Sequence, residues 1–339
     1  MTIKQIVEEA IKRKLFPGVV IGVSDSSNTL YSEAFGTLEE KTPTTLETLY
    51  DIASLTKVTS TLPAILKLIQ AGDIDLFDKV SDYIEFTDHE TLIWHLLTHT
   101  SGMPPYSAAY QYKSNRDEIL REIKLELFKD APGKQVVYSC LNYILLMTIV
   151  EKVTGNFKDY VNNELFKPLD MNYTGYKPND NTHTAPTSLR NGKLLQGEPD
   201  DELAFYLGGI SGNAGVFSNV PDLLKYTREI LNPHKVFSKQ IIQTSTRRWT
   251  RGITGDEKGL GWMHYTFASS GGSLLSSKAF GHTGFTGTSM WIDPENDLAI
   301  VILANRCFYS RHERTAEMLR FRRRISNRLV SAISEGQTP

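Results

Sequence analysis

The stretch Asp51-Ile52-Ala53-Ser54-Leu55-Thr56-Lys57-Val58 is the most informative part of this chain, because it places a hydroxyl and an amine three residues apart where an apolar helical pattern begins. Positions i and i+3 of a helix share a face, so Lys57 is expected to reach the Ser54 oxygen. A serine hydroxyl is a weak nucleophile until a neighbouring group takes its proton. The first helical turn adds free N–H groups and a positive dipole end. The alternative, and the commoner meaning of so short a motif, is an N-capping serine with a solvated lysine.

The composition is that of an ordinary globular protein of 339 residues, 40% hydrophobic and 22% charged. Lys plus Arg is 37 and Asp plus Glu is 39, so the net charge of −2 draws the chain neither to nucleic acid nor to an anionic membrane. The basic run Arg320–Arg324 is expected to be a solvated face of a C-terminal helix, with an anion- or membrane-contacting patch as the alternative. The expected partner is a small molecule; the sequence does not fix an oligomeric state.

Cysteines and targeting signals are sparse. Cys140 and Cys307 are too few for a disulfide framework, and Cys307 is expected to be a small buried residue. The charged first ten residues do not form a signal peptide, and the longest apolar stretch, residues 143–150, is too short to span a bilayer. For a complete chain this predicts a cytoplasmic protein without an integral membrane segment; a signal removed by cloning would leave no trace.

Strand patterns lie near both ends of the chain and helical patterns fill its middle. The expected strands are 18–24, 29–36, 260–267, 278–282, 288–293 and 298–304. The expected helices are 3–15, one after Ser54 that ends near Gly72 and is kinked at Pro63, one over about 139–154, and one over about 311–333. The polar segment 178–199 is expected to be an exposed loop.

This order predicts an α+β fold in which one antiparallel sheet is built from both chain ends and flanked by helices, with a mostly helical subdomain inserted. We expect residues 1–72 and 233–339 to form the sheet domain and residues 73–232 the helical subdomain. The active site is expected between them.

Three short stretches carry the chemistry, in the order Ser54–Lys57, Tyr138-Ser139-Cys140 and His282-Thr283-Gly284. Together they resemble the serine β-lactamase and penicillin-binding-protein superfamily, specifically its class C-like branch, which has Ser-x-x-Lys, Tyr-x-Asn and Lys/His-Thr-Gly motifs in this order. The resemblance extends over most of the chain, from about Pro17 to Arg306, through further matches at Leu97–Pro104, Gly208–Ser218, Trp291–Pro294 and Leu303–Arg306.

The resemblance implies a role for each residue of the first two motifs. Ser54 is the implied nucleophile, which forms an acyl-enzyme, and Lys57 keeps Ser54 and its partner in the right protonation state. Desolvation is expected to lower the Lys57 pKa. Tyr138 is the implied second base; a free tyrosine titrates near ~10, so it needs a nearby cation, Lys57 first. The alternative for Tyr138 is a core tyrosine with a satisfied hydroxyl.

The resemblance also implies an oxyanion hole made of the backbone N–H groups of Ser54 and Phe285. The implied substrate-binding residues are Cys140, His282, Thr283 and Gly284. Gly284 is expected to permit close approach of backbone and substrate, with a plain turn glycine as the alternative.

Two departures from the family pattern bear on the substrate. Cys140 stands where the branch usually has Asn, and a thiol lacks the paired donor and acceptor of an amide. His282 replaces a lysine, so a permanent carboxylate anchor is lost. Both changes favour an esterase with weak β-lactamase activity at most, or a D-stereospecific peptidase or DD-carboxypeptidase. A catalytically silent relative that binds peptidoglycan fragments or a peptide is the alternative of another class.

Neither a metal nor a cofactor is expected. His95 and His99 have an i, i+4 spacing, but no third ligand is indicated, and His99 is expected to brace its loop. Tyr106, Tyr110 and Tyr112 either line a substrate groove or pack against the protein.

Overall fold

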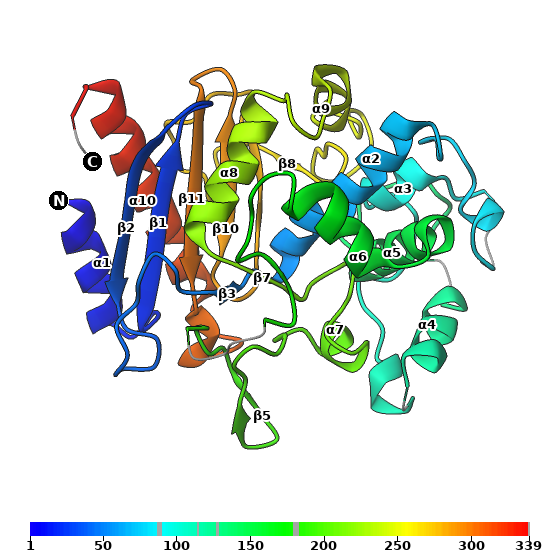
Figure 1. The fold of residues 1–339 in the computed structure, drawn as a ribbon, viewed down its shortest axis with the longest axis horizontal. Coiled ribbons are helices and arrows are strands. Elements are labelled where there is room, and N and C mark those ends of the chain that lie inside the picture. Colours follow the sequence, from blue (N-terminus) through cyan, green and yellow to red (C-terminus); the bar gives the residue numbers. More distant parts are fainter. Residues whose placement is uncertain (87–89, 114, 127–128, 179–182, 338–339) are drawn as a thin grey trace.

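The computed structural model describes residues 1–86, 90–113, 115–126, 129–178 and 183–337. Within these ranges, six strands form a sheet in the order β2-β1-β11-β10-β9-β8, with every neighbouring pair antiparallel (Figure 1). The strands are β1 (Gly18–Ser24), β2 (Thr29–Gly36), β8 (Met263–His264), β9 (Phe280–Thr283), β10 (Ser289–Asp293) and β11 (Leu298–Ala304). Because β1 pairs with β11, the expected sheet built from both chain ends is confirmed.

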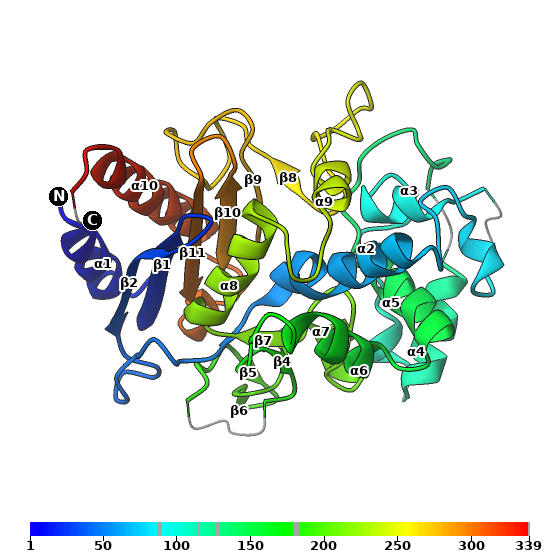
Figure 2. The ribbon, with the colours of Figure 1, turned by 45° about the horizontal axis from the view of Figure 1, so that its top comes forward.

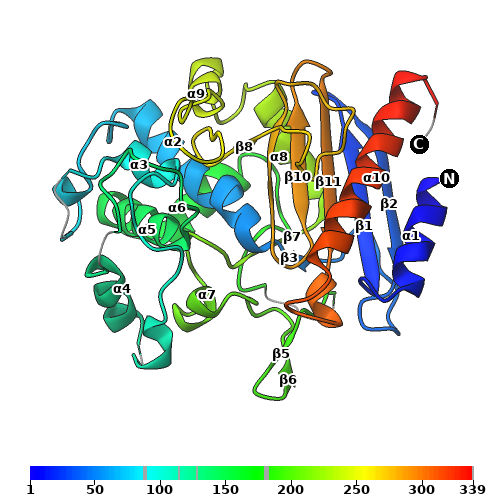
Figure 3. The ribbon, with the colours of Figure 1, turned by 180° about the vertical axis from the view of Figure 1, so that it is seen from behind.

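Helices cover both faces of this sheet. Figure 3 shows α1 (Ile3–Lys12) and α10 (Thr315–Ser334) on one face, and Figure 1 shows α8 (Val220–Leu231) on the other. The side chains of β1 alternate between the two layers: Ile21 belongs to the cluster under α1 and α10, and Val20 to the cluster under α8. Gly22 lets α8 approach closely, because a Cβ there would lie 2.3 Å from a Val220 methyl group.

The remaining helices gather at one end of the sheet (Figure 2). They are α2 (Leu62–Ala71), α3 (Ile93–Leu97), α4 (Arg116–Lys124), α5 (Cys140–Thr154), α6 (Phe157–Val161), α7 (Glu202–Tyr206) and α9 (Lys239–Ser245). A small sheet of β3 (Tyr50–Asp51), β7 (Val216–Ser218) and β4 (Gly175–Tyr176) leads into the stretch that carries Ser54. The division into two domains stays a prediction; α8, inside the range assigned to the helical subdomain, packs on the sheet.

Most expected elements are present, with three differences. The segment 178–199 is not simply an exposed loop: residues 184–188 are buried, and β5 (Leu189–Arg190) pairs with β6 (Lys193–Leu194); residues 179–182 lie outside the described ranges. The expected strand 260–267 is reduced to β8. Instead of a simple kink at Pro63, the π-helical segment Lys57–Thr61 leads into α2, whose first turn tolerates the missing N–H of Pro63.

The basic run in α10 is not uniformly solvated. Arg320 is exposed as expected, but Arg322 is only 8% exposed and donates hydrogen bonds to backbone carbonyls. Cys307 is buried, as predicted, and both cysteines are free. No helix of the described ranges has the length and apolar character needed to cross a membrane.

Candidate active site

Ser54 lies at a sharp bend that follows strand β3. The preceding residue, Ala53, has a left-handed φ of 47°, and its N–H donates to the Asp51 carboxylate at 2.8 Å. Ala53–Leu55 then forms a 3₁₀ turn, in which positions i and i+3 are nearly eclipsed. The predicted contact is confirmed: Lys57 Nζ lies 3.1 Å from Ser54 Oγ. The alternative of a capping serine and a solvated lysine is wrong, since Lys57 is fully buried and no Ser54 capping bond forms.

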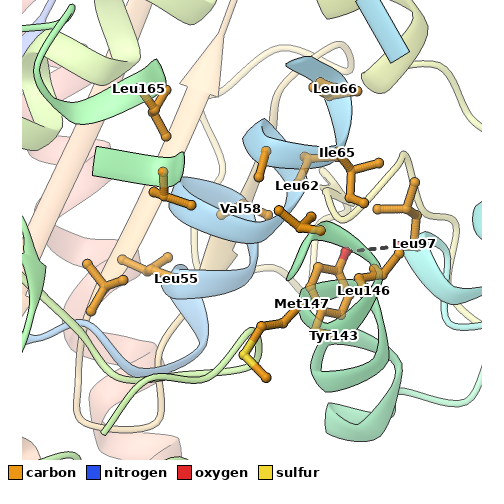
Figure 4. Packing of buried hydrophobic residues seen from close by; sticks show 14 of the residues in the cluster. Leu55, Val58, Leu62, Ile65, Leu66, Leu97, Tyr143, Leu146, Met147 and Leu165 are labelled. Carbon is orange, nitrogen blue, oxygen red and sulfur yellow. Dashed lines mark hydrogen bonds between the residues drawn. The ribbon is translucent and has the colours of Figure 1, made fainter. Parts of the chain in front are cut away.

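The Lys57 ammonium group is held by three acceptors. It donates to Ser54 Oγ, to the Asn213 carbonyl at 2.9 Å and to the Cys140 sulfur at 3.6 Å. Figure 4 shows why these groups keep their places: the helical segment after Ser54 lies beside α5, with Val58 and Leu62 turned toward its Tyr143. This apolar packing fixes the separation between Lys57 and Cys140, the first residue of α5.

Tyr138 joins this group from the loop before α5. Lys57 Nζ lies 5.0 Å from the centre of its ring, and the Tyr138 hydroxyl interacts with both Lys57 and Ser54. The His99 ring lies tilted against the Tyr138 ring, with the ring centres 4.6 Å apart, and His99 Nδ1 accepts from the Ser139 N–H at 3.1 Å. His99 was expected to brace its own loop, and these contacts brace the Tyr138 loop instead. Tyr138 is 39% exposed, so the alternative of a core tyrosine is wrong.

The pKa of Lys57 shifts in the direction opposite to the expected one. Burial lowers the pKa of Lys57, but interactions with Cys140, Tyr138 and Asp201 outweigh it, so the Lys57 pKa is raised. Although the Tyr138 side chain as a whole is 39% exposed, desolvation at its hydroxyl raises the pKa of Tyr138, and Lys57 offsets this only in part. The expected lowering of the lysine pKa is therefore wrong. At neutral pH the site holds an ammonium ion and a neutral phenol.

The turn after β9 lies directly against the approach to Ser54. The hydroxyl of Thr286 donates to the Asp51 carbonyl at 2.7 Å, and that of Thr288 to the Ile52 carbonyl at 3.0 Å. A Cβ on Gly284 would lie 2.5 Å from the Ile52 carbonyl oxygen, so this position needs a glycine for packing of the turn itself. Among the described residues, neither the Ser54 N–H nor the Phe285 N–H donates to a protein acceptor, which leaves both available.

His282 and Thr283 border the site on β9. The His282 ring is 2% exposed and lies 6.0 Å from the Tyr138 ring, while Thr283 is half-buried. Burial, together with the cations Lys57 and Lys258, lowers the pKa of His282 to about 3. His282 is therefore neutral at physiological pH, and it offers no permanent positive charge to a substrate.

Two residues of the site had no role in the sequence interpretation. Besides accepting from Lys57, Asn213 donates from its amide to the Asp201 carboxylate at 3.1 Å, and it also interacts with the Cys140 thiol. The Tyr106 hydroxyl donates to the same carboxylate at 3.3 Å. The glycine-rich segment 208–218 was the available signal for Asn213, whereas no motif marks Asp201.

The other aromatic and histidine candidates have structural surroundings. Tyr110 stacks on Tyr206 at 5.4 Å, and Tyr112 is largely exposed. The described residues contain no group of three or more His, Cys, Asp or Glu side chains placed to hold a metal ion. His95 Nδ1 accepts from the Leu92 N–H, so His95 and His99 are engaged by different backbone segments.

Comparison with known proteins identifies the family and the fold. Residues 3–322 match the family model described as "Beta-lactamase". The chain is 32% identical to a putative D-alanyl-D-alanine carboxypeptidase of Escherichia coli K12, over 86% of this chain and 79% of that protein. It is 30% identical to an N-acetylmuramyl-L-alanine amidase of Bacillus subtilis strain 168, over 88% and 80%.

Solved structures share the fold. A penicillin-binding protein homologue from Pyrococcus abyssi has a TM-score of 0.78 at 24% identity, covering 99% of this chain and 77% of its own. The hydrolase EstCE1, described as having promiscuous acyltransferase activity, has a TM-score of 0.79 at 19% identity, covering 97% of each chain.

Proposed function

Since this chain belongs to the β-lactamase family, we propose that it is a serine hydrolase that works through an acyl-enzyme on Ser54. The observation that carries the proposal is the contact of Lys57 Nζ with Ser54 Oγ at 3.1 Å, beside the hydroxyl of Tyr138. A serine hydroxyl becomes a good nucleophile when a neighbouring group can take its proton. The buried amine of Lys57 and the phenol of Tyr138 are such neighbours of Ser54. The proposed substrates are small carboxylic esters or amides, with weak β-lactamase activity at most.

The proposed reaction begins once the Tyr138–Lys57 pair has lost one proton. Ser54 Oγ then attacks the substrate carbonyl carbon while the proton of the Ser54 hydroxyl passes to this pair. The resulting oxyanion accepts from the N–H groups of Ser54 and Phe285. When the tetrahedral intermediate collapses, the pair returns the proton to the leaving group, which departs from the acyl carbon. A water molecule then attacks the acyl carbon of the Ser54 ester while the same pair takes its proton. The bond between the acyl carbon and Ser54 Oγ breaks, the pair returns the proton to Ser54 Oγ, and the carboxylic acid leaves.

Two features support esters over β-lactams. Cys140 cannot supply the donor and acceptor of an amide, and the neutral His282 supplies no cation for a substrate carboxylate. The second candidate is a D-stereospecific peptidase or DD-carboxypeptidase; the carboxypeptidase name of the Escherichia coli relative favours it. A silent binding relative is disfavoured, because a pure binding role gives no reason for Lys57 to be buried against a serine hydroxyl.

A labelling experiment tests the nucleophile. The protein is incubated with a fluorophosphonate probe or a fluorescent penicillin, and the adduct is located by mass spectrometry. We expect the label on Ser54 and none on the Ser54→Ala variant; equal labelling of the two proteins, or no labelling of the intact protein, would overturn the assignment. A panel of p-nitrophenyl acyl esters, D-amino-acid p-nitroanilides and nitrocefin then ranks the substrates, and we expect short-chain esters to be hydrolysed faster than nitrocefin.

A further inference from the structure

The C-terminal helix reaches the turn after β9 through one buried side chain. A single Nη of Arg322 donates to the Gly284 carbonyl at 3.2 Å and to the Thr288 carbonyl at 2.9 Å. The same Thr288 carbonyl accepts from the Gly284 N–H at 2.7 Å. The guanidinium group therefore links the first and last residues of the turn, Gly284 and Thr288. The turn thus has a support that lies more than thirty residues further along the sequence.

The Gly284 carbonyl and the Phe285 N–H belong to one peptide unit. In a trans peptide the C=O and N–H bonds lie in one plane and point in opposite directions. A donor held on the carbonyl therefore fixes the direction of the N–H and strengthens it as a donor, because hydrogen bonds in series polarise one another. Here the donor on the carbonyl is a cation, which makes the bond stronger than a neutral one.

We propose that Arg322 is a positioning residue for the oxyanion hole, which orients and polarises the Gly284–Phe285 peptide unit toward the acyl group on Ser54. The inference rests on the proposed function, because it takes the Phe285 N–H as an oxyanion donor. Arg322 does not touch the substrate; it acts through the peptide unit.

A second arginine reinforces the same turn. Arg306, 4% exposed, donates from its guanidinium to the Phe285 carbonyl at 2.7 Å and from its backbone N–H to the Thr286 carbonyl at 2.7 Å. Within the described residues, the oxygen acceptors of both guanidinium groups are backbone carbonyls, so neither group is hydrogen-bonded to a carboxylate. Burial and the nearby Arg306 lower the pKa of Arg322 to about 9, so Arg322 remains a cation at neutral pH. The two buried positive charges next to the turn therefore favour a negative charge at the Phe285 N–H, where the proposed oxyanion would form.

The test compares Arg322→Gln with Arg320→Gln, an exposed arginine on the same helix. We expect Arg322→Gln to lower kcat/KM for p-nitrophenyl butanoate by roughly 10²- to 10³-fold, the range for a misplaced or lost oxyanion donor, with KM changed less than about threefold. The inhibition constant of phenylboronic acid, which forms a tetrahedral adduct on serine, is expected to weaken by a similar factor. Arg320→Gln is expected to match the wild type in all three quantities.

A purely structural role predicts a different outcome, in which the melting temperature falls but kcat/KM and boronate inhibition of the folded protein stay at wild-type values. That result overturns the inference. If Arg322→Gln does not fold, Arg322→Lys takes its place; it keeps the charge but not the planar fork, and we expect a smaller loss in both quantities. Wild-type values for this folded variant also overturn the inference. Failure of the proposed function is distinguishable, because the wild type itself would then show no Ser54 label.

Discussion

The ammonium nitrogen of Lys57 donates a hydrogen bond to the hydroxyl oxygen of Ser54, over 3.1 Å. An ammonium group that donates to Ser54, the proposed nucleophile, cannot at the same time accept the proton of the Ser54 hydroxyl. The raised pKa values of Lys57 and Tyr138 mean that both groups carry their protons at neutral pH. In the proposed reaction, the resting site must therefore lose one proton before Ser54 can be acylated.

Activity is accordingly expected to increase with pH. The reactive form lacks one proton of the Lys57–Tyr138 pair, and since that pair titrates above neutrality, kcat/KM should rise about tenfold per pH unit from about pH 6 to about pH 9. Hydrolysis of p-nitrophenyl butanoate at constant ionic strength measures this, with Ser54→Ala as the background. A plateau that begins near pH 7 would show that the resting pair already contains a free base.

Removal of the Tyr138 hydroxyl should affect the reaction far more than the fold. Tyr138→Phe keeps the ring that packs against His99 but loses the proposed proton carrier, so kcat/KM should fall by about 10²- to 10⁴-fold. Tyr112→Phe, at a tyrosine that is 63% exposed, is the matched control and should retain full activity. If Tyr138→Phe kept more than a tenth of wild-type activity, Lys57 alone would be the base.

Cys140→Asn tests whether the thiol limits the substrate range. The new amide would lie near the Lys57 ammonium group and the Asn213 side chain, where it would supply the donor and acceptor that a lactam amide can use. We expect nitrocefin hydrolysis to rise about tenfold relative to ester hydrolysis, a gain of ~1.4 kcal/mol in transition-state binding. Cys140→Ala, which removes the thiol without adding an amide, is the control. An unchanged ratio would mean that Cys140 is not what limits lactam hydrolysis.

Gly284→Ala should damage the site by steric overlap. The added methyl group would lie 2.1 Å from the Thr288 hydroxyl and 2.5 Å from the Ile52 carbonyl, so the turn would have to move away from the Ser54 bend. A shift of about 1 Å in a reacting group can cost roughly 10²-fold in rate, which is the loss expected here in kcat/KM. Gly175→Ala is the matched control, because a Cβ there meets no atom within 4 Å. Equal activity of the two variants would show that the turn yields without moving Phe285.

Asp51 should make stability depend on pH. Burial raises the pKa of the Asp51 carboxyl to about 7, although it accepts from the N–H groups of Ala53 and Asp200. Above about pH 4, near the pKa of an unfolded aspartate, the unfolded chain releases the Asp51 proton while the folded chain still holds it. The contribution of Asp51 to the free energy of unfolding therefore falls from about pH 4 to about pH 7 and stays constant above about pH 7. Each pKa unit corresponds to about 1.4 kcal/mol, so a loss of a few kcal/mol is expected.

The measurement is the free energy of unfolding of the wild type and of Asp51→Asn at pH 4.5 and pH 7.5. The variant should show a smaller loss over this interval, whereas Asp73→Asn, at an exposed aspartate, should behave as the wild type does. The same loss in all three proteins would assign the pH dependence to other groups.

Patterns that act locally were predictable from the sequence. The apolar run of β11 and the helix of α5, which ends at a left-handed Gly155, follow from residues that are close in sequence. The contact of Lys57 with Ser54 also follows from spacing alone, because three residues of helical turn bring the two side chains together. The length of β8 was not predictable, since pairing at a sheet edge depends on neighbours that no local pattern contains.

The sequence by itself therefore determined the order of elements, the contact between Ser54 and Lys57, and the family to which the three motifs belong. Only the tertiary structure decided the charge state of that pair, because the pKa of Lys57 depends on Cys140, Tyr138 and Asp201, which are distant in sequence and gathered by folding. It likewise revealed that Arg322, in a run expected to be solvated, is buried against the Gly284 carbonyl. Burial and through-space charge are properties of packed neighbours, and a one-dimensional pattern does not contain them.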